Sequence, residues 1–283
     1  MGLAAGFDKD GEALFGLASL GFGFMTVGSV MERPSVGNPK PRILRYLREE
    51  ALVNSLGLPS KGLDYVSRQL LKKPREPAII VSVAGFDAEE YSGLIQKLGP
   101  LADVIEVNLS SPTFYLRSGD QTSLDGVSRI LAAVVRARKK IPVLVKLPPK
   151  AQTANFEEFV HGAIKSGVEG FTATNTLRGK AVRIAVGFGG LSGKPLFNEA
   201  RGTVTALYHM TDGRLPIIGT GGIFRPREAY DMIAAGASCV SLYTGLVYRG
   251  PGVVRDINRG LAKLLREGGF KSLAELRGSA VRP

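Results

Sequence analysis

The sequence predicts an α/β protein, a single (β/α)8 TIM barrel with insertions at the mouth where the strands end. Eight short apolar runs of strand length alternate with eight helical segments along the 283 residues. The 36 glycines suit the many short turns that such an alternation needs. No linker separates the chain into parts, so we expect residues 1–283 to form one barrel domain.

The expected strands are rich in apolar and β-branched residues, as strands of a buried parallel sheet are. They cover residues 2–6, 23–28, 78–83, 103–109, 142–147, 170–174, 215–218 and 239–242. A helical pattern follows each strand. The first expected helix ends near residue 20, and the sixth ends near residue 210. The other six cover residues 62–72, 88–98, 124–139, 154–166, 226–235 and 253–267.

Three connections are too long for simple turns: residues 29–61, 111–121 and 175–198. The first is polar and rich in proline, and the third is rich in glycine. All three follow the carboxyl ends of strands, so they should gather at one mouth of the barrel. Connections of this length inside a compact domain are usually functional.

The composition excludes several classes of protein. The single cysteine, Cys239, cannot form an internal disulfide or a four-cysteine metal or iron–sulfur site, and we expect no metal. The chain contains no HExxH, GxSxG, P-loop or GxGxxG pattern. It also has no signal peptide and no apolar run near the roughly 18 residues of a membrane span. We expect a cytoplasmic protein, and peripheral contact with a membrane stays open.

The net charge of +12 raises the question of nucleic-acid binding. The lysines and arginines are scattered, however, and they lack a dense basic run or interleaved aromatic residues. A solvated surface, or steering of small anions, explains the charge more simply. We therefore expect no nucleic-acid partner.

The stretch 215–246 predicts a phosphate site. An apolar strand ends in Gly219-Thr220-Gly221-Gly222 before a helix, and a second apolar strand ends in Tyr243-Thr244-Gly245. Glycines let backbone N–H groups approach an anion, and a helix N-terminus adds a positive dipole end. The last two strands of a TIM barrel are the usual place for phosphate. Tight turns without a ligand are the simpler alternative.

Polar side chains follow the other strands, where barrel enzymes hold their site residues. These residues are Lys9, Ser29, Asn108, Ser110, Ser111, Lys146, Asn175 and Thr176. Lys146 ends an apolar strand, and a buried ammonium group is costly unless it meets a negative charge. With no usable histidine or carboxylate among them, these residues suit a planar anion beside a phosphate-bearing cofactor that supplies the chemistry.

Several motifs together resemble the dihydroorotate dehydrogenase family. They occur in the family's order and cover nearly the whole chain. The motifs are Ala4-Ala5-Gly6-Phe7-Asp8-Lys9, Asn108-Leu109-Ser110-Ser111-Pro112, Val145-Lys146-Leu147-Pro148-Pro149, Thr174-Asn175-Thr176, Gly189-Gly190-Leu191-Ser192-Gly193-Lys194-Pro195-Leu196, Ile218-Gly219-Thr220-Gly221-Gly222 and Leu242-Tyr243-Thr244-Gly245.

The resemblance implies a TIM-barrel flavoprotein that oxidises dihydroorotate to orotate in pyrimidine (UMP) biosynthesis, acts as a homodimer and holds FMN at the barrel mouth. It places the FMN phosphate on Gly193, Gly221, Gly222, Tyr243 and Thr244. It places the flavin ring near Ala5 and Gly6, with Ser29, Asn108, Lys146 and Thr174 around its edge. The implied substrate residues are Lys9, Asn54, Asn108, Asn175 and Thr176.

The resemblance also assigns two catalytic residues. Ser111 matches the base that removes the proton from C5 of dihydroorotate while hydride passes from C6 to flavin N5. Lys146 would stabilise negative charge at flavin N1/O2. A free serine is a weak base, so its proton must pass to a neighbour or a water that the sequence does not identify.

The sequence signals that indicate the subclass, and with it the electron acceptor, conflict. Ser111 and Leu116-Arg117-Ser118 resemble the quinone-using class, whereas residues 54–59 and 82–85 resemble the soluble class. Thr113 replaces the family's usual asparagine. Quinone is slightly favoured, and fumarate, or NAD through a partner subunit with FAD and iron–sulfur centres, stays open. The alternative function is a flavin-free, phosphate-binding lyase or isomerase barrel that uses Lys146.

Overall fold

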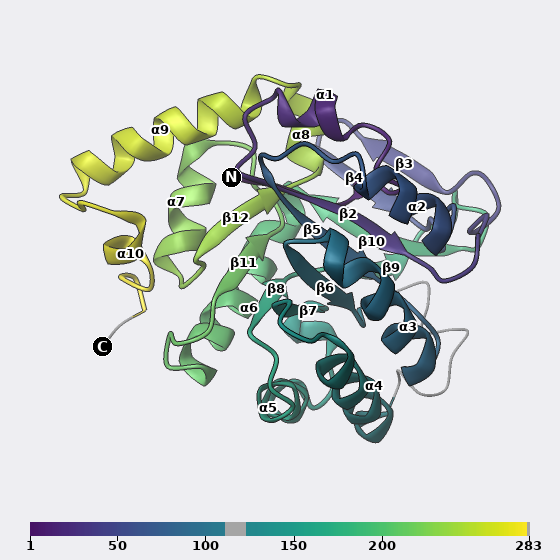
Figure 1. Ribbon diagram of the computed structural model, residues 1–283. Coiled ribbons are helices and arrows are strands. Elements are labelled where there is room, and N and C mark those ends of the chain that lie inside the picture. The colour runs from purple at the N-terminus through teal and green to yellow at the C-terminus, as the bar shows by residue number, and fades with distance from the viewer. Residues whose placement is uncertain (111–122, 282–283) are drawn as a thin grey trace.

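A computed structural model describes residues 1–110 and 123–281, and they form the predicted barrel. The barrel strands are β1 (Gly2–Asp8), β2 (Phe24–Val30), β5 (Ala78–Val83), β6 (Val104–Asn108), β7 (Val143–Leu147), β8 (Gly170–Ala173), β11 (Ile217–Thr220) and β12 (Cys239–Leu242). They are parallel and close in the order β1-β12-β11-β8-β7-β6-β5-β2 (Figure 1). The predicted (β/α)8 fold class is confirmed, and the strand positions differ from prediction only at their ends.

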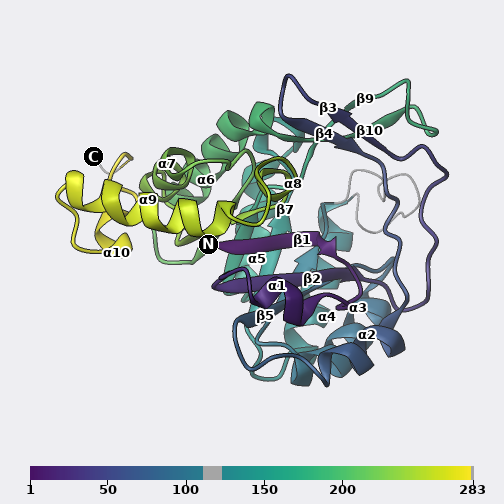
Figure 2. The same ribbon diagram turned by 90° about the horizontal axis from the view of Figure 1, so that it is seen from above.

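Helices surround the barrel (Figures 1 and 2). They are α1 (Leu14–Ala18), α2 (Leu63–Leu70), α3 (Ala88–Leu98), α4 (Leu124–Ala137), α5 (Phe156–Lys165), α6 (Phe197–Met210), α7 (Pro226–Ala234), α8 (Thr244–Arg249), α9 (Val253–Glu267) and α10 (Leu273–Leu276). The short helices α8 and α10 were not predicted. Side-chain caps fix some starts: Asp87 accepts a hydrogen bond from the Glu90 N–H at α3. None of the described helices is long and apolar enough to cross a membrane.

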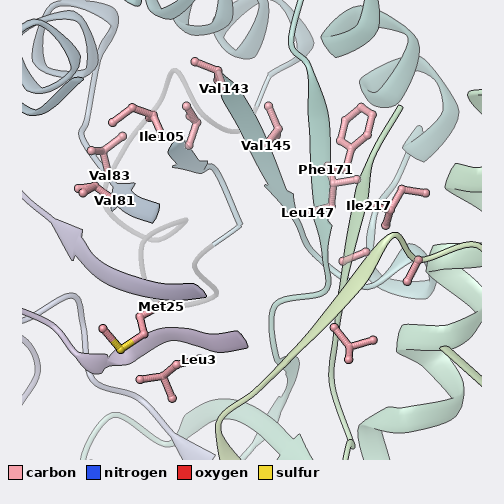
Figure 3. Close-up of a cluster of buried hydrophobic side chains, with 14 of the residues drawn as sticks. Leu3, Met25, Val81, Val83, Ile105, Val143, Val145, Leu147, Phe171 and Ile217 are labelled. Carbon is pink, nitrogen blue, oxygen red and sulfur yellow. The ribbon is translucent and has the colours of Figure 1, made fainter. Parts of the chain in front are cut away.

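Alternate residues of the strands face the helices and form the main core (Figure 3). On β7 these are Val143, Val145 and Leu147, all fully buried, and Ile105 on β6 joins them. The remaining strand residues point into the barrel. They form a lower apolar layer, which includes Ile80, Leu144 and Ile218, and an upper polar layer toward the mouth.

Two of the predicted loops are wrong in detail, because each contains a pair of strands. The first connection, 29–61, holds β3 (Ile43–Tyr46) and β4 (Ala51–Asn54), and the third, 175–198, holds β9 (Leu177–Lys180) and β10 (Phe188–Gly193). They form one antiparallel sheet in the order β3-β4-β10-β9. Figure 2 shows this sheet beyond the ends of the barrel strands, at the mouth where the insertions were expected to gather.

Glycines bring β10 close to β4. A Cβ at Gly189 would lie 2.7 Å from Val53 Cγ1 and 2.8 Å from Asn54 O, and one at Gly193 would lie 2.3 Å from Glu50 O. The glycine-rich composition that suggested a loop is therefore what permits the strand pairing. The Tyr248 hydroxyl on α8 donates to Ala51 O at 2.8 Å, which ties this sheet to the last βα unit of the barrel.

Candidate active site

The barrel mouth contains a cavity of about 1150 Å³, counting its open end. The barrel strand ends form its floor, and the small sheet forms one wall through Ile43, Leu52 and Asn54. The carboxyl ends of the strands are where barrel enzymes bind their ligands.

The cavity brings together all of the predicted cofactor and substrate residues that the structure describes. They are Ala5, Gly6, Lys9, Ser29, Asn54, Asn108, Lys146, Thr174, Asn175, Thr176, Gly193, Gly221, Gly222, Tyr243 and Thr244. They come from β1, β2, β4, β6, β7, β10 and the segments after β8, β11 and β12. The predicted base, Ser111, lies outside the described residues.

The two glycines after β11 occupy positions where a side chain would clash with neighbouring residues. Gly221 and Gly222 have φ of +133° and +71°, a region that L residues with side chains rarely adopt. A Cβ there would lie 2.9 Å from Ala200 Cβ and 2.5 Å from Phe197 Cβ. Main-chain groups therefore face this part of the cavity, as an anion site requires.

The second glycine turn packs against the first. A Cβ at Gly245 would lie 2.3 Å from Ile223 O, so only glycine permits this approach. The Thr244 hydroxyl shares a hydrogen bond of 2.9 Å with Ser192 on β10. The three cavity segments near residues 193, 222 and 244 are thus joined through direct contacts.

A hydrogen-bond network orients the two asparagines. Asn108 donates to Ser29 Oγ at 2.8 Å, and its Oδ1 accepts from Ser110 Oγ at 3.0 Å. Asn175 donates to Ser110 O and Oγ, both at 3.0 Å, and its Oδ1 accepts from the Thr176 N–H at 2.8 Å. Each amide has two N–H donors. The network holds both amides in place. Among the described residues Asn108 Nδ2 has one acceptor, Ser29 Oγ, so its second N–H can serve a ligand.

Two lysines give the cavity a positive field. Lys9 follows β1 and Lys146 lies on β7, and no acidic residue is among the described residues that line the cavity. Burial lowers the pKa of Lys9 to about 8, an effect that Asp10 opposes and the Lys146 and Arg42 charges reinforce. An anion in the cavity would relieve this repulsion.

The sequence reasoning missed part of the cavity. The apolar wall of Ile43, Leu52, Leu56 and Leu58 belongs to the first insertion, whose folded form was not predicted. It also missed Glu106, a buried acid whose Oε1 lies 3.8 Å from Lys146 Nζ. An acid inside the apolar run of β6 is the same kind of signal that singled out Lys146.

Comparisons with known proteins agree with this architecture. The family profile for dihydroorotate dehydrogenase matches residues 1–265. The dihydroorotate dehydrogenase (quinone) of Roseiflexus sp. strain RS-1 is 38% identical over 99% of this chain and 82% of its own length. The mitochondrial dihydroorotate dehydrogenase (quinone) of Mus musculus is 37% identical over 98% of this chain and 76% of its own length.

A solved structure gives the same result. The crystal structure of the Eimeria tenella enzyme in complex with ferulenol superposes with a TM-score of 0.90 at 31% identity, over 100% of this chain and 85% of that one. The barrel, its positively charged mouth and these relatives together define a (β/α)8 oxidoreductase. The chain belongs to the dihydroorotate dehydrogenase family.

The lowered pKa of Lys9 predicts a pH window in stability. Its pKa is about 8 in the folded protein against 10.5 for the unperturbed group. Between these values the unfolded state binds more protons, so unfolding free energy rises with pH. Between pH 8 and pH 10.5 the free energy of unfolding of the native protein should rise by roughly 1–3 kcal/mol relative to that of Lys9→Met.

Urea unfolding at several pH values measures this difference. Lys9→Arg is the matched control, since its guanidinium stays charged throughout and should show no gain relative to Lys9→Met. A native protein whose stability runs parallel to that of Lys9→Met across this window would contradict the shifted pKa.

Proposed function

We propose that this chain binds FMN and oxidises dihydroorotate to orotate in pyrimidine biosynthesis, with a quinone as electron acceptor. The observation that carries the proposal is that the predicted cofactor and substrate residues converge on one cavity. They come from seven strands of the barrel or the segments after them, and from two strands of the small sheet. Residues 1–283 would form one FMN-binding domain. A cytoplasmic location, with peripheral contact with a membrane left open, and assembly as a homodimer stay predictions.

The residues present fit FMN. A phosphate needs closely approaching backbone groups, and the turns at Gly221, Gly222 and Gly245 leave no room for a Cβ. The Ser192 and Thr244 hydroxyls lie at the same end of the cavity. Ala5, Gly6, Asn108 and Lys146, on β1, β6 and β7, would receive the flavin ring. Bound FMN would supply the hydride acceptor, its N5, for the hydride that leaves C6 of dihydroorotate.

Lys9 and the asparagines would hold the substrate. The Lys9 ammonium would offset the substrate carboxylate, and binding would raise its pKa back toward the ordinary value because an opposite charge favours the protonated form. The Asn108 and Asn175 amides are already oriented through Ser110, Ser29 and Thr176. Preorganised donors of this kind fix the substrate's ring with a smaller ordering cost.

Two residues would carry the chemistry. Ser111 would take the proton from C5 of dihydroorotate and pass it on, since a serine alkoxide cannot persist at neutral pH. Lys146 would stabilise negative charge at the N1/O2 edge of the flavin. Its strand position on β7 and its burial fix the ammonium group before substrate binds.

Quinone is favoured as acceptor because both relatives described above are named as quinone enzymes. The conflicting subclass signals make a direct comparison of acceptors worthwhile. FMN-loaded protein, purified without oxygen, should lose its visible flavin absorbance on addition of dihydroorotate. The absorbance should return faster with a quinone than with fumarate or NAD. Protein that cannot take up FMN would refute the proposal.

Replacing Ser111 separates catalysis from cofactor binding. Ser111→Ala should slow flavin bleaching by about 10²-fold or more, the usual contribution of a general base, while FMN binding stays native. Ser19→Ala, at an exposed serine beyond α1, is the control and should bleach at the native rate. Stopped-flow absorbance measures both. Equal loss of FMN and of bleaching in Ser111→Ala would indicate a structural role.

A glycine substitution tests the phosphate end of the cavity. In Gly222→Ala the new Cβ meets Phe197 and the backbone has positive φ, so the turn must shift. FMN affinity should fall by about tenfold or more, since such strain costs of order 1–3 kcal/mol. Gly202→Ala is the matched control, because its Cβ meets open space on α6 and its affinity should stay native. Fluorescence titration of FMN into apoprotein measures both, and native affinity in Gly222→Ala would count against this phosphate site.

A further inference from the structure

Glu106 is a buried acid in the barrel interior, below the floor of the cavity. It lies on β6 two residues before Asn108, so both side chains face into the barrel. The residue is 2% exposed, and within the described part of the chain its Oε1 has no hydrogen-bond partner. A carboxylate in such a place is costly unless another charge compensates it.

The neighbouring strands offer Glu106 little besides Lys146. On β5 its register partner is Ser82, whose hydroxyl shares a hydrogen bond with Ser29. On β7 its register partner is Leu144, part of the lower apolar layer. Lys146, two residues further along β7, brings its Nζ to 3.8 Å from Glu106 Oε1. The lysine side chain is itself 8% exposed, so both charges lie away from water.

The separation of the two groups matters. At 3.8 Å the pair attracts through charge but does not form a hydrogen bond. The N–H groups of Lys146 therefore remain for a ligand in the cavity that Lys146 lines. Thr172, the register partner of Lys146 on β8, also has a buried hydroxyl without a partner among the described residues. Glu106 thus lies on the side of Lys146 away from the cavity and offers it an opposite charge.

We propose that Glu106 is a positioning residue that acts through Lys146 and limits how strongly Lys146 favours reduced flavin. This inference rests on the proposed function, because it assumes FMN above Lys146. Attraction to the carboxylate holds the Lys146 ammonium group back in the barrel, away from the flavin's N1/O2 edge, and so weakens the positive field of the lysine there. Removing the carboxylate charge should therefore favour the reduced cofactor, which carries more negative charge.

The experiment measures the flavin reduction potential of FMN-loaded native protein and Glu106→Gln. In Glu106→Gln the ratio of reduced to oxidised FMN at a fixed ambient potential should rise by about tenfold. For a two-electron couple this corresponds to a reduction potential about 30 mV higher. Glu106→Asp keeps the charge and should lie closer to the native value. A native potential in Glu106→Gln with FMN bound would overturn the inference.

A double-mutant comparison tests whether Glu106 acts through Lys146. Lys146→Met and Glu106→Gln/Lys146→Met should have equal potentials, because the proposed route is gone. A difference between them would overturn the inference. If a single variant fails to fold, because removing one member of a buried ion pair is strongly destabilising, Glu106→Asp serves instead. It keeps both charges but moves the carboxylate away from Lys146, so its potential should lie slightly above the native value, and a potential no higher than the native one would overturn the inference.

The outcomes separate this inference from the proposed function. Native protein that binds no FMN, or is not bleached by dihydroorotate, would refute the function. Native protein that binds FMN and is bleached, with an unchanged potential in Glu106→Gln, would refute only the role of Glu106.

Discussion

The two-residue alternation of a strand in a closed barrel governs this structure. One set of side chains must fill the space under the helices, and the other must fill the barrel interior. On β7 the first set is Val143, Val145 and Leu147, and the second is Leu144 and Lys146. The alternation therefore points the charged Lys146 side chain into the barrel near the mouth. Apolar packing ends there, and an anionic ligand can compensate the positive charge.

The cavity depends on parts that lie far apart in the sequence. The floor comes from strand ends, the glycine turns come from the last two βα units, and one wall comes from the small sheet. Non-covalent contacts connect these parts. Ser192 is hydrogen-bonded to Thr244 and Tyr248 to Ala51, and Lys194 forms an ion pair with Glu50. Groups that must hold one cofactor at several points are thus held to one another first, which lowers the ordering cost of binding.

Much of the fold and the candidate site could be predicted because its signals are local. Eight apolar runs mark the barrel strands, and polar residues such as Asn108 and Asn175 directly after them mark the mouth. The small sheet could not be predicted in this way, because β3 and β9 are short and largely exposed, and the two hairpins meet only through the pairing of β4 with β10, which lie far apart in the sequence. Glu106 could not be predicted from strand ends, because it lies inside β6.

The pairing of β4 with β10 has a consequence for how such enzymes diverge. The two insertions that supply these strands are separate stretches of sequence, yet each completes the hydrogen bonds of the other. Neither can be exchanged alone for its counterpart from another protein without leaving an unpaired edge and misfitted glycines. Chimeras should therefore swap the two stretches as a unit, and natural drift in one should constrain drift in the other.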